Sequence, residues 1–252
     1  GFFEKEKDFI FKTYLEAAND IRDDYTFLHT FDASVRDHYK VNVNTVVVFQ
    51  AERFYTKYEP KRADMEVKEE TDVVAIRSFI AENEIPLVGE YSPPAKRYSG
   101  RPLVLFFYTV DFSFDGQKAT QIWRNKIAGI AKEFKDLTFA IADEEKNKDM
   151  FKEFGFEDSG EEMNVGILGD KDRKYPMEPE DYDEDVITEF IQSFQKGKLT
   201  PKIKSQPVPK KQGVVKVVVG NSFEKIVMDP KTDVLIELYA PWCGHCKKLE
   251  PI

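Results

Sequence analysis

Two consecutive stretches of this chain carry strand and helix patterns in the same order, and this repetition restricts the possible folds more than any other feature. In each stretch, short runs rich in Val, Ile and Phe alternate with segments whose apolar residues recur at helical spacing. The repeat is about 110 residues long, far longer than the repeat of a solenoid protein. The sequence therefore predicts an α/β fold with a duplicated domain, each copy having a mixed central sheet flanked by helices.

The first stretch is expected to contain a strand end, a helix, a strand, a short helix, two further strands and a final helix. These elements are predicted, in this order, over residues 1–3, 7–22, 25–31, 32–39, 45–50, 55–66 and 72–83. The helix over 7–22 has five apolar side chains at or beside helical spacing, so we expect them to face a core. They are Phe11, Tyr14, Leu15, Ala18 and Ile21.

The second stretch repeats this order. Strands are predicted over 102–110, 137–143, 164–168 and 173–178, and helices over 117–134, 147–156 and 183–197. The inward faces of the first and last of these helices are predicted to consist of Trp123, Ile127, Ile130, Ala131 and Phe134, and of Val186, Phe190, Ile191 and Phe194. The aromatic run "FYTVDFSFD" is interpreted as core rather than as a cleft that binds peptides.

The chain is predicted to contain two complete or nearly complete modules, a linker and the start of a third module. The first module spans 1–85 and lacks its N-terminal part, and the second spans 86–199. The segment 200–213 is rich in Pro and Lys without apolar periodicity, which is typical of a stiff extended linker whose lysines are solvated. Residues 214–252 then repeat the strand and helix order that opens a module, with strands predicted over 214–220 and 233–240 and a helix over 222–229.

Charge and apolar run length exclude two classes of partner. The 37 basic and 46 acidic residues give a net charge of -9, which argues against nucleic acid, since phosphate contacts need clustered Lys and Arg. The longest apolar runs have about nine residues, whereas a membrane-spanning helix needs about 20, so we expect no membrane segment. The chain begins without Met or a signal sequence, so we expect both ends to be cuts in a longer protein.

The only two cysteines, Cys243 and Cys246, are separated by two residues in "WCGHC". They follow a predicted strand and open a predicted helix, where unpaired N–H groups favour a thiolate. We therefore predict Cys243 as the nucleophile and Cys246, one helical turn away, as the resolving thiol. His245 would stabilise the thiolate, and Gly244 would leave the approach open.

Other interpretations of these polar residues have less support. A zinc site needs about four ligands, and the remaining histidines lie in the first module. Haem attachment needs a His after the second Cys, where this chain has Lys247. An inert structural disulfide stays an alternative. The "DYDEDV" stretch resembles the start of a calcium loop, but its sixth position is Val186 rather than Gly, so we interpret its carboxylates as a helix cap.

With these residues, the chain resembles the protein disulfide isomerase family, whose members join thioredoxin-like modules in the endoplasmic reticulum. "DVLIELY" followed by "APWCGHCKKLEP" is similar to a catalytic site of that family, and the two modules without cysteine are similar to its b and b′ modules. The resemblance implies a tandem thioredoxin-like fold, localisation in the lumen of the endoplasmic reticulum and thiol–disulfide oxidoreductase and isomerase activity. It implies no cofactor besides the redox-active Cys243–Cys246 disulfide.

The resemblance also implies further site residues and partners. Glu237 matches the acid that moves a proton to the second cysteine, and its apolar neighbours favour a buried position over an exposed one. Trp242 matches a residue beside the motif that contacts peptides. The implied partners are unfolded or misfolded secretory polypeptides and other chaperones of the endoplasmic reticulum. Some relatives bind lectin chaperones through a basic face, and the acidity of this chain argues against that partner.

Two functions remain open from the sequence. A catalytic module of this family also needs a cis-proline loop, further strands and a closing helix, which would lie beyond Ile252. The two modules without cysteine cannot exchange disulfides, so their function is binding or spacing. The alternative function of this chain is therefore a non-catalytic scaffold that binds clients or a chaperone.

Overall fold

The computed structural model describes residues 1–92, 98, 102–156, 162–203, 205–240 and 242–249. The chain divides into two compact units, Gly1–Lys202 and Ile203–Ile252. The first unit contains both predicted modules without cysteine, and each of them has a sheet and a hydrophobic cluster of its own. The boundary between them at residues 85 and 86 stays a prediction.

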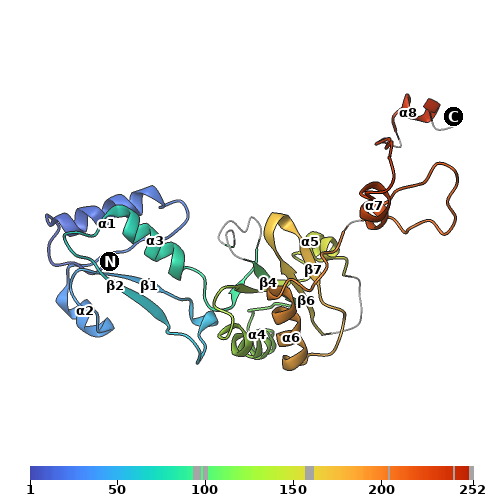
Figure 1. The fold of residues 1–252 in the computed structure, drawn as a ribbon. Helices are drawn as coiled ribbons and strands as arrows, with labels where there is room; N and C mark the ends of the chain where they lie inside the picture. Colours follow the sequence, from blue (N-terminus) through green and yellow to red (C-terminus); the bar gives the residue numbers. More distant parts are fainter. Residues whose placement is uncertain (93–97, 99–101, 157–161, 204, 241, 250–252) are drawn as a thin grey trace. The chain divides into compact units, whose positions relative to one another are not determined.

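The first module consists of helices packed on a two-stranded sheet (Figure 1). Its elements are α1 (Phe9–Asp20), α2 (Ala33–Tyr39), β1 (Thr45–Phe49), the 3-10 helix η1 (Glu52–Phe54), β2 (Arg62–Glu66) and α3 (Val73–Asn83). β1 and β2 are antiparallel, with Thr45 opposite Glu66 and Phe49 opposite Arg62. All three predicted helices are confirmed within two residues at each end.

Two predicted strands of this module are wrong in extent. The segment 25–31 forms only one isolated bridge, from Thr30 to Phe2, because its neighbour over residues 1–3 is too short for a ladder. The strand predicted over 55–66 is reduced to β2, since η1 and a loop precede it. On α1, Leu15 is exposed and Ala17 is buried instead, so the predicted inward stripe is rotated by part of a turn.

The second module is built on a five-stranded mixed sheet in the order β3-β5-β4-β6-β7. Its elements are β3 (Gly89–Glu90), β4 (Leu103–Tyr108), α4 (Gln117–Ala131), β5 (Thr138–Asp143), α5 (Lys148–Phe154), β6 (Asn164–Leu168), η3 (Asp170–Asp172), β7 (Lys174–Pro176) and α6 (Glu184–Gln195). β3 and β4 run parallel to β5, whereas β6 is antiparallel to β4 and to β7. The mixed sheet is confirmed, and β3 is an addition that the sequence pattern did not predict.

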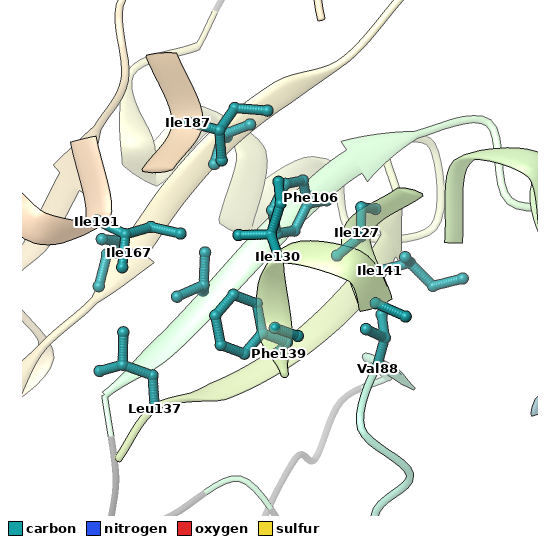
Figure 2. Packing of buried hydrophobic residues seen from close by; sticks show 14 of the residues in the cluster. Val88, Phe106, Ile127, Ile130, Leu137, Phe139, Ile141, Ile167, Ile187 and Ile191 are labelled. Carbon is teal, nitrogen blue, oxygen red and sulfur yellow. The ribbon is translucent and has the colours of Figure 1, made fainter. Parts of the chain in front are cut away.

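The central strand β4 is buried at all six positions. Its side chains alternate between two hydrophobic clusters, with Phe106 in one and Phe107 in the other. Figure 2 shows the first cluster, in which Phe106 and Phe139 of the sheet meet Ile127 and Ile130 of α4. A continuous apolar run suits this position because helices cover both faces of the sheet.

The last helix of the second module begins at an acidic cap, as predicted. The Asp183 carboxylate accepts hydrogen bonds from the backbone N–H groups of Asp185, at 2.8 Å, and Val186, at 3.1 Å. Ile191 faces the core as predicted, and Ile187, which was not predicted, is buried beside it. The carboxylates of "DYDEDV" therefore begin a helix, as expected.

The second unit has little regular structure among its described residues. It contains α7 (Gly220–Val227) and the short α8 (Cys246–Leu249). The strands predicted over 214–220 and 233–240 are not formed, because a strand needs a neighbour for its backbone groups and no described residue pairs with them. Across the described parts of both units, no helix is long and apolar enough to cross a bilayer.

Candidate active site

The two cysteines form a disulfide at the start of α8. Their Cα atoms are 5.3 Å apart, and the backbone N–H of Cys246 donates to Sγ of Cys243 at 3.3 Å. The N–H of Cys243 in turn donates to the carbonyl of Ala240 at 2.9 Å, which holds the turn that leads into the helix. The backbone thus directs a donor at the sulfur of the predicted nucleophile.

The residues around the disulfide leave it open to solvent. Both cysteines are half-exposed, Trp242 is 83% exposed, and His245 is exposed. A Cβ atom at Gly244 would meet nothing within 4 Å, so the space between the cysteines is free. The disulfide is therefore partly accessible to solvent among the described residues.

Glu237 does not occupy the buried position that its sequence neighbours predicted. The residue is exposed, as are Leu235 and Leu238 beside it. The reason is the missing strand, since residues 233–240 pair with no other strand in the described chain. The burial prediction is wrong for the chain as it stands, and the proposed proton transfer by Glu237 remains a prediction.

The described residues give no support to a metal site. No group of three or more His, Cys, Asp or Glu side chains lies close enough to hold an ion within the described chain. Asp183, the third residue of the calcium-like pattern, uses its carboxylate to cap α6.

The equivalent strand-to-helix junction of the second module carries hydrogen-bonded side-chain oxygen atoms where the last unit has cysteine sulfurs. The Thr120 hydroxyl accepts from the N–H of Asp111 at 2.9 Å and donates to the carbonyl of the same residue at 2.8 Å. The Ser113 N–H and hydroxyl both donate to the Asp111 carboxylate, and these two bonds lower the pKa of that group. The Val110 N–H donates to Asp143 at 3.2 Å. This junction is closed by hydrogen bonds and contains no cysteine.

The aromatic run "FYTVDFSFD" divides between core and surface. Phe107, Tyr108 and Val110 are buried, as the core interpretation predicts. Phe114 is 98% exposed, and Ile122 on the first turns of α4 is 50% exposed. The core interpretation is thus confirmed for the strand and wrong for Phe114.

Sequence reasoning missed Arg124, which is fully buried on α4. Arg124 lies four residues after the buried Thr120 and three before the buried Ile127. This spacing places a charged side chain on the apolar face of the helix, and that inconsistency in the pattern was the available signal.

Comparison with known protein families covers nearly the whole chain. A model described as a thioredoxin-like domain matches residues 3–193, and one described as thioredoxin matches residues 214–252. The crystal structure of the bb fragment of ERp72 is similar at a TM-score of 0.76 and 44% identity, covering 80% of this chain and 89% of that chain. The tandem thioredoxin-like fold is confirmed.

Curated relatives are protein disulfide-isomerases. The chain is 51% identical to protein disulfide-isomerase A4 of Bos taurus over 254 residues, which are 100% of this chain and 40% of that protein. It is 36% identical to protein disulfide-isomerase A3 of Gallus gallus over 262 residues, which are 100% of this chain and 51% of that protein. The stretches "VDFSFD", "FAIADEE" and "KSQPVPK" favour A4 over A3, and these identities agree.

The chain spans 40% of the length of the A4 protein of Bos taurus, so the resemblance concerns a part of that protein. The fold, the mixed sheet and the family model that covers residues 3–193 agree with one another. The chain therefore belongs to the thioredoxin-like family, and its sequence is similar to those of protein disulfide-isomerases.

Proposed function

We propose that this chain carries a redox site of a thiol–disulfide oxidoreductase and isomerase that assists oxidative protein folding. The observation that carries the proposal is the hydrogen bond from the Cys246 N–H to Sγ of Cys243. Such a donor stabilises a thiolate at Cys243 after reduction, because an anionic sulfur accepts hydrogen bonds more strongly than a neutral thiol. The similarity to protein disulfide-isomerases A4 supports the same reaction.

The reaction has two balanced exchange steps. The Cys243 thiolate attacks one sulfur of a client disulfide, forms a mixed disulfide and releases the other client sulfur as a thiolate. The Cys246 thiolate then attacks Sγ of Cys243, closes the Cys243–Cys246 disulfide and releases the second client thiolate. The client is reduced and the cysteine pair is oxidised. The same two steps in reverse oxidise a client dithiol to a disulfide. If another thiol of the client attacks the mixed disulfide instead, a new client disulfide forms, the Cys243 thiolate is released, and the client is isomerised.

Four nearby residues assist these steps in the proposal. His245 stabilises the Cys243 thiolate electrostatically, and Gly244 leaves room for the client sulfur. Trp242 offers an exposed aromatic surface to the client polypeptide. Glu237 moves a proton to and from Cys246 when its strand is paired.

The lumen of the endoplasmic reticulum is the compartment that we infer. A cysteine pair persists as a disulfide in an oxidising compartment, whereas the cytosol keeps it as two thiols. Unfolded or misfolded secretory polypeptides are the proposed partners. The redox-active pair is itself the electron carrier, so the exchange needs no bound cofactor.

Alkylation rates of the reduced chain test the redox proposal. The Cys246→Ser variant reports on Cys243, and the Cys243→Ser variant reports on Cys246. At neutral pH, we expect Cys243 to react with iodoacetamide faster than Cys246, because its sulfur accepts a hydrogen bond from the Cys246 N–H. The same variants unfolded in urea serve as the reference, where an ordinary thiol has a pKa of about 8.5. Equal rates in the folded and the unfolded variants would contradict the proposal.

In a second candidate function, the two modules without cysteine act as a chaperone and bind unfolded clients. The observation that favours it is the exposed apolar pair Phe114 and Ile122 at the junction of β4 and α4. Exposed apolar side chains can bury apolar surface of an unfolded chain, and this burial favours association.

Fluorescence anisotropy of a labelled, cysteine-free unfolded peptide tests this binding function. Phe114→Ser and Ile122→Ser are expected to weaken binding by the whole chain. Phe9→Ser is the matched control, because Phe9 is 63% exposed in the first module. If the control weakens binding as much as the two variants, the site is not at this junction. If none does, these modules act as spacers.

A further inference from the structure

The loop between β1 and β2 of the first module packs against the second module, and we call this contact the joint. Tyr58 of this loop packs against the hydrophobic cluster of the second module that contains Phe106 and Ile127. A Cβ atom at Gly129 of α4 would lie 3.3 Å from the Tyr58 hydroxyl, so the glycine allows a close approach of the ring to the helix. The contact is therefore specific to this part of α4.

Arg124 lies at the centre of this joint and contacts both modules. Its side chain is 0% exposed, and its Nε–H donates to the carbonyl of Val88 at 2.8 Å. Its Nη2 lies 3.7 Å from Oε1 of Glu59, and its guanidinium carbon lies 5.0 Å from the centre of the Phe54 ring. Phe54 and Glu59 come from the first module, whereas Val88 and Arg124 belong to the second.

Glu59 completes the joint from the side of the first module. One oxygen of its carboxylate accepts the backbone N–H of Leu87, next to the predicted module boundary, while the other faces Arg124. Burial raises the pKa of Glu59 and lowers the pKa of Arg124. In both groups burial disfavours the charged form, so the pair resembles buried ion pairs whose desolvation offsets their attraction.

The other polar contacts across the joint are more exposed. Arg53 pairs with Glu90 at 3.6 Å with half of its side chain in solvent, and its carbonyl accepts from the amide of Gln121. A hollow of about 510 Å³ separates the parts of α3, α4 and β5 that line it. Among the described residues, Arg124 is the only charged residue that is buried.

We propose that Arg124 is a positioning residue that fixes the orientation of the first module against the second. A buried guanidinium needs a countercharge and an aromatic face around it, and only one docking orientation brings Glu59 and Phe54 to that place. Other orientations separate the Arg124 cation from both of these partners. The Arg124–Glu59 pair thus selects one orientation of the two modules and adds little to the strength of their docking. This inference does not depend on the redox or the client-binding function.

The distance distribution between two spin labels, one on each module, tests the proposal. The first 240 residues contain no cysteine, so labels can be attached at Glu16→Cys on α1 and Glu189→Cys on α6, both exposed, in the whole chain with Cys243→Ser and Cys246→Ser. We expect one narrow distribution. In Arg124→Met the distribution should widen by about twofold, because modules without a specific interface move relative to one another by default.

Two further variants separate positioning from stability. Arg124→Met with Glu59→Gln removes both charges, so it should stay folded and still show the wide distribution. Arg77→Met removes an exposed ion pair with Asp20 within the first module and should leave the distribution narrow. If Arg124→Met alone does not fold, the double variant decides. A narrow distribution in the folded double variant, or in folded Arg124→Met, overturns the proposal.

Discussion

The strand-to-helix junction of the second module and that of the last unit occupy the same place in a repeated pattern, yet they differ in every contact. In the second module, β4 is buried on both faces, and Thr120 hydrogen-bonds both backbone groups of Asp111. In the last unit, residues 233–240 form no strand, and the turn carries a disulfide between two partly buried cysteines. One junction is a structural closure, and we propose that the other is a reactive site.

The difference teaches that the same local pattern can serve stability or chemistry. A closed junction satisfies its own backbone groups, so it contributes to the stability of its module. An open junction leaves the Cys246 N–H directed at Cys243, where it can stabilise charge that develops on the sulfur. The following four changes would break or sharpen this distinction.

Loss of the nucleophile should have the largest effect, because it removes the chemistry altogether. Cys243→Ser should abolish exchange with a peptide disulfide in the reduced chain, since a hydroxyl does not attack a disulfide under these conditions. Cys246→Ser should instead accumulate the mixed disulfide, which mass spectrometry detects. Exchange that persists in Cys243→Ser would assign the attack to Cys246.

Truncation of the central strand should act on the second module alone. Phe107→Ala removes a fully buried ring between two layers and should lower the unfolding free energy by about 3–5 kcal/mol. Urea unfolding followed by circular dichroism measures this loss. Phe114→Ala is the matched control, because that ring is 98% exposed and should change stability by less than about 0.5 kcal/mol. Equal losses in both variants would refute the assignment of the two rings to core and surface.

Opening the closed junction should have an intermediate effect. Thr120→Val keeps the shape of the buried side chain but leaves the Asp111 N–H without its acceptor, at a cost of about 1–3 kcal/mol. Ser113→Ala, on the exposed side of the same junction, should cost less. The same unfolding measurement compares them, and a larger loss for Ser113→Ala would show that the junction is held from its exposed side.

The smallest effect should be a pH dependence from Glu59. Burial raises its folded-state pKa above the ordinary value of 4.5, so the folded state binds a proton more tightly than the unfolded state. The stability that this proton contributes is fully present below pH 4.5 and is lost as pH rises through the folded pKa. The hydrogen bond from the Leu87 N–H and the charge of Arg124 both lower the pKa of Glu59 and so oppose the shift.

The difference in unfolding free energy between parent and Glu59→Gln isolates this contribution. The parent should lose stability relative to the variant as pH rises above 4.5, and the difference should become constant above the folded pKa. A difference with the opposite slope would mean that the hydrogen bond from Leu87 and the attraction of Arg124 together exceed the cost of burial.

Much of the fold was predictable from residue spacing. The helices α1, α3, α4 and α6 and the strand β4 follow from periodicities that span few residues, so they were located within a few positions. The segment 25–31 has the composition of a strand, but its ladder depends on a neighbour elsewhere in the chain. Strand pairing involves residues distant in sequence, and composition does not report it.

The candidate site divides in the same way. The Cys-x-x-Cys spacing of Cys243 and Cys246 is local, so it predicted both the pairing and the turn before α8. Burial of Glu237 required partner strands, which the described residues do not supply, and that prediction failed. Exposure of Phe114 likewise depended on what the rest of the module covers.

The amino-acid sequence was sufficient to determine the duplicated α/β pattern and the position of the cysteine pair, because periodicity and motif spacing are properties of neighbouring residues, and the thioredoxin-like fold followed from the family resemblance. Only the tertiary structure revealed that Arg124 is buried against Glu59 and Phe54. These residues are separated by about 65 to 70 positions, and their proximity arises from the packing of α4 against the β1–β2 loop, which no local pattern encodes.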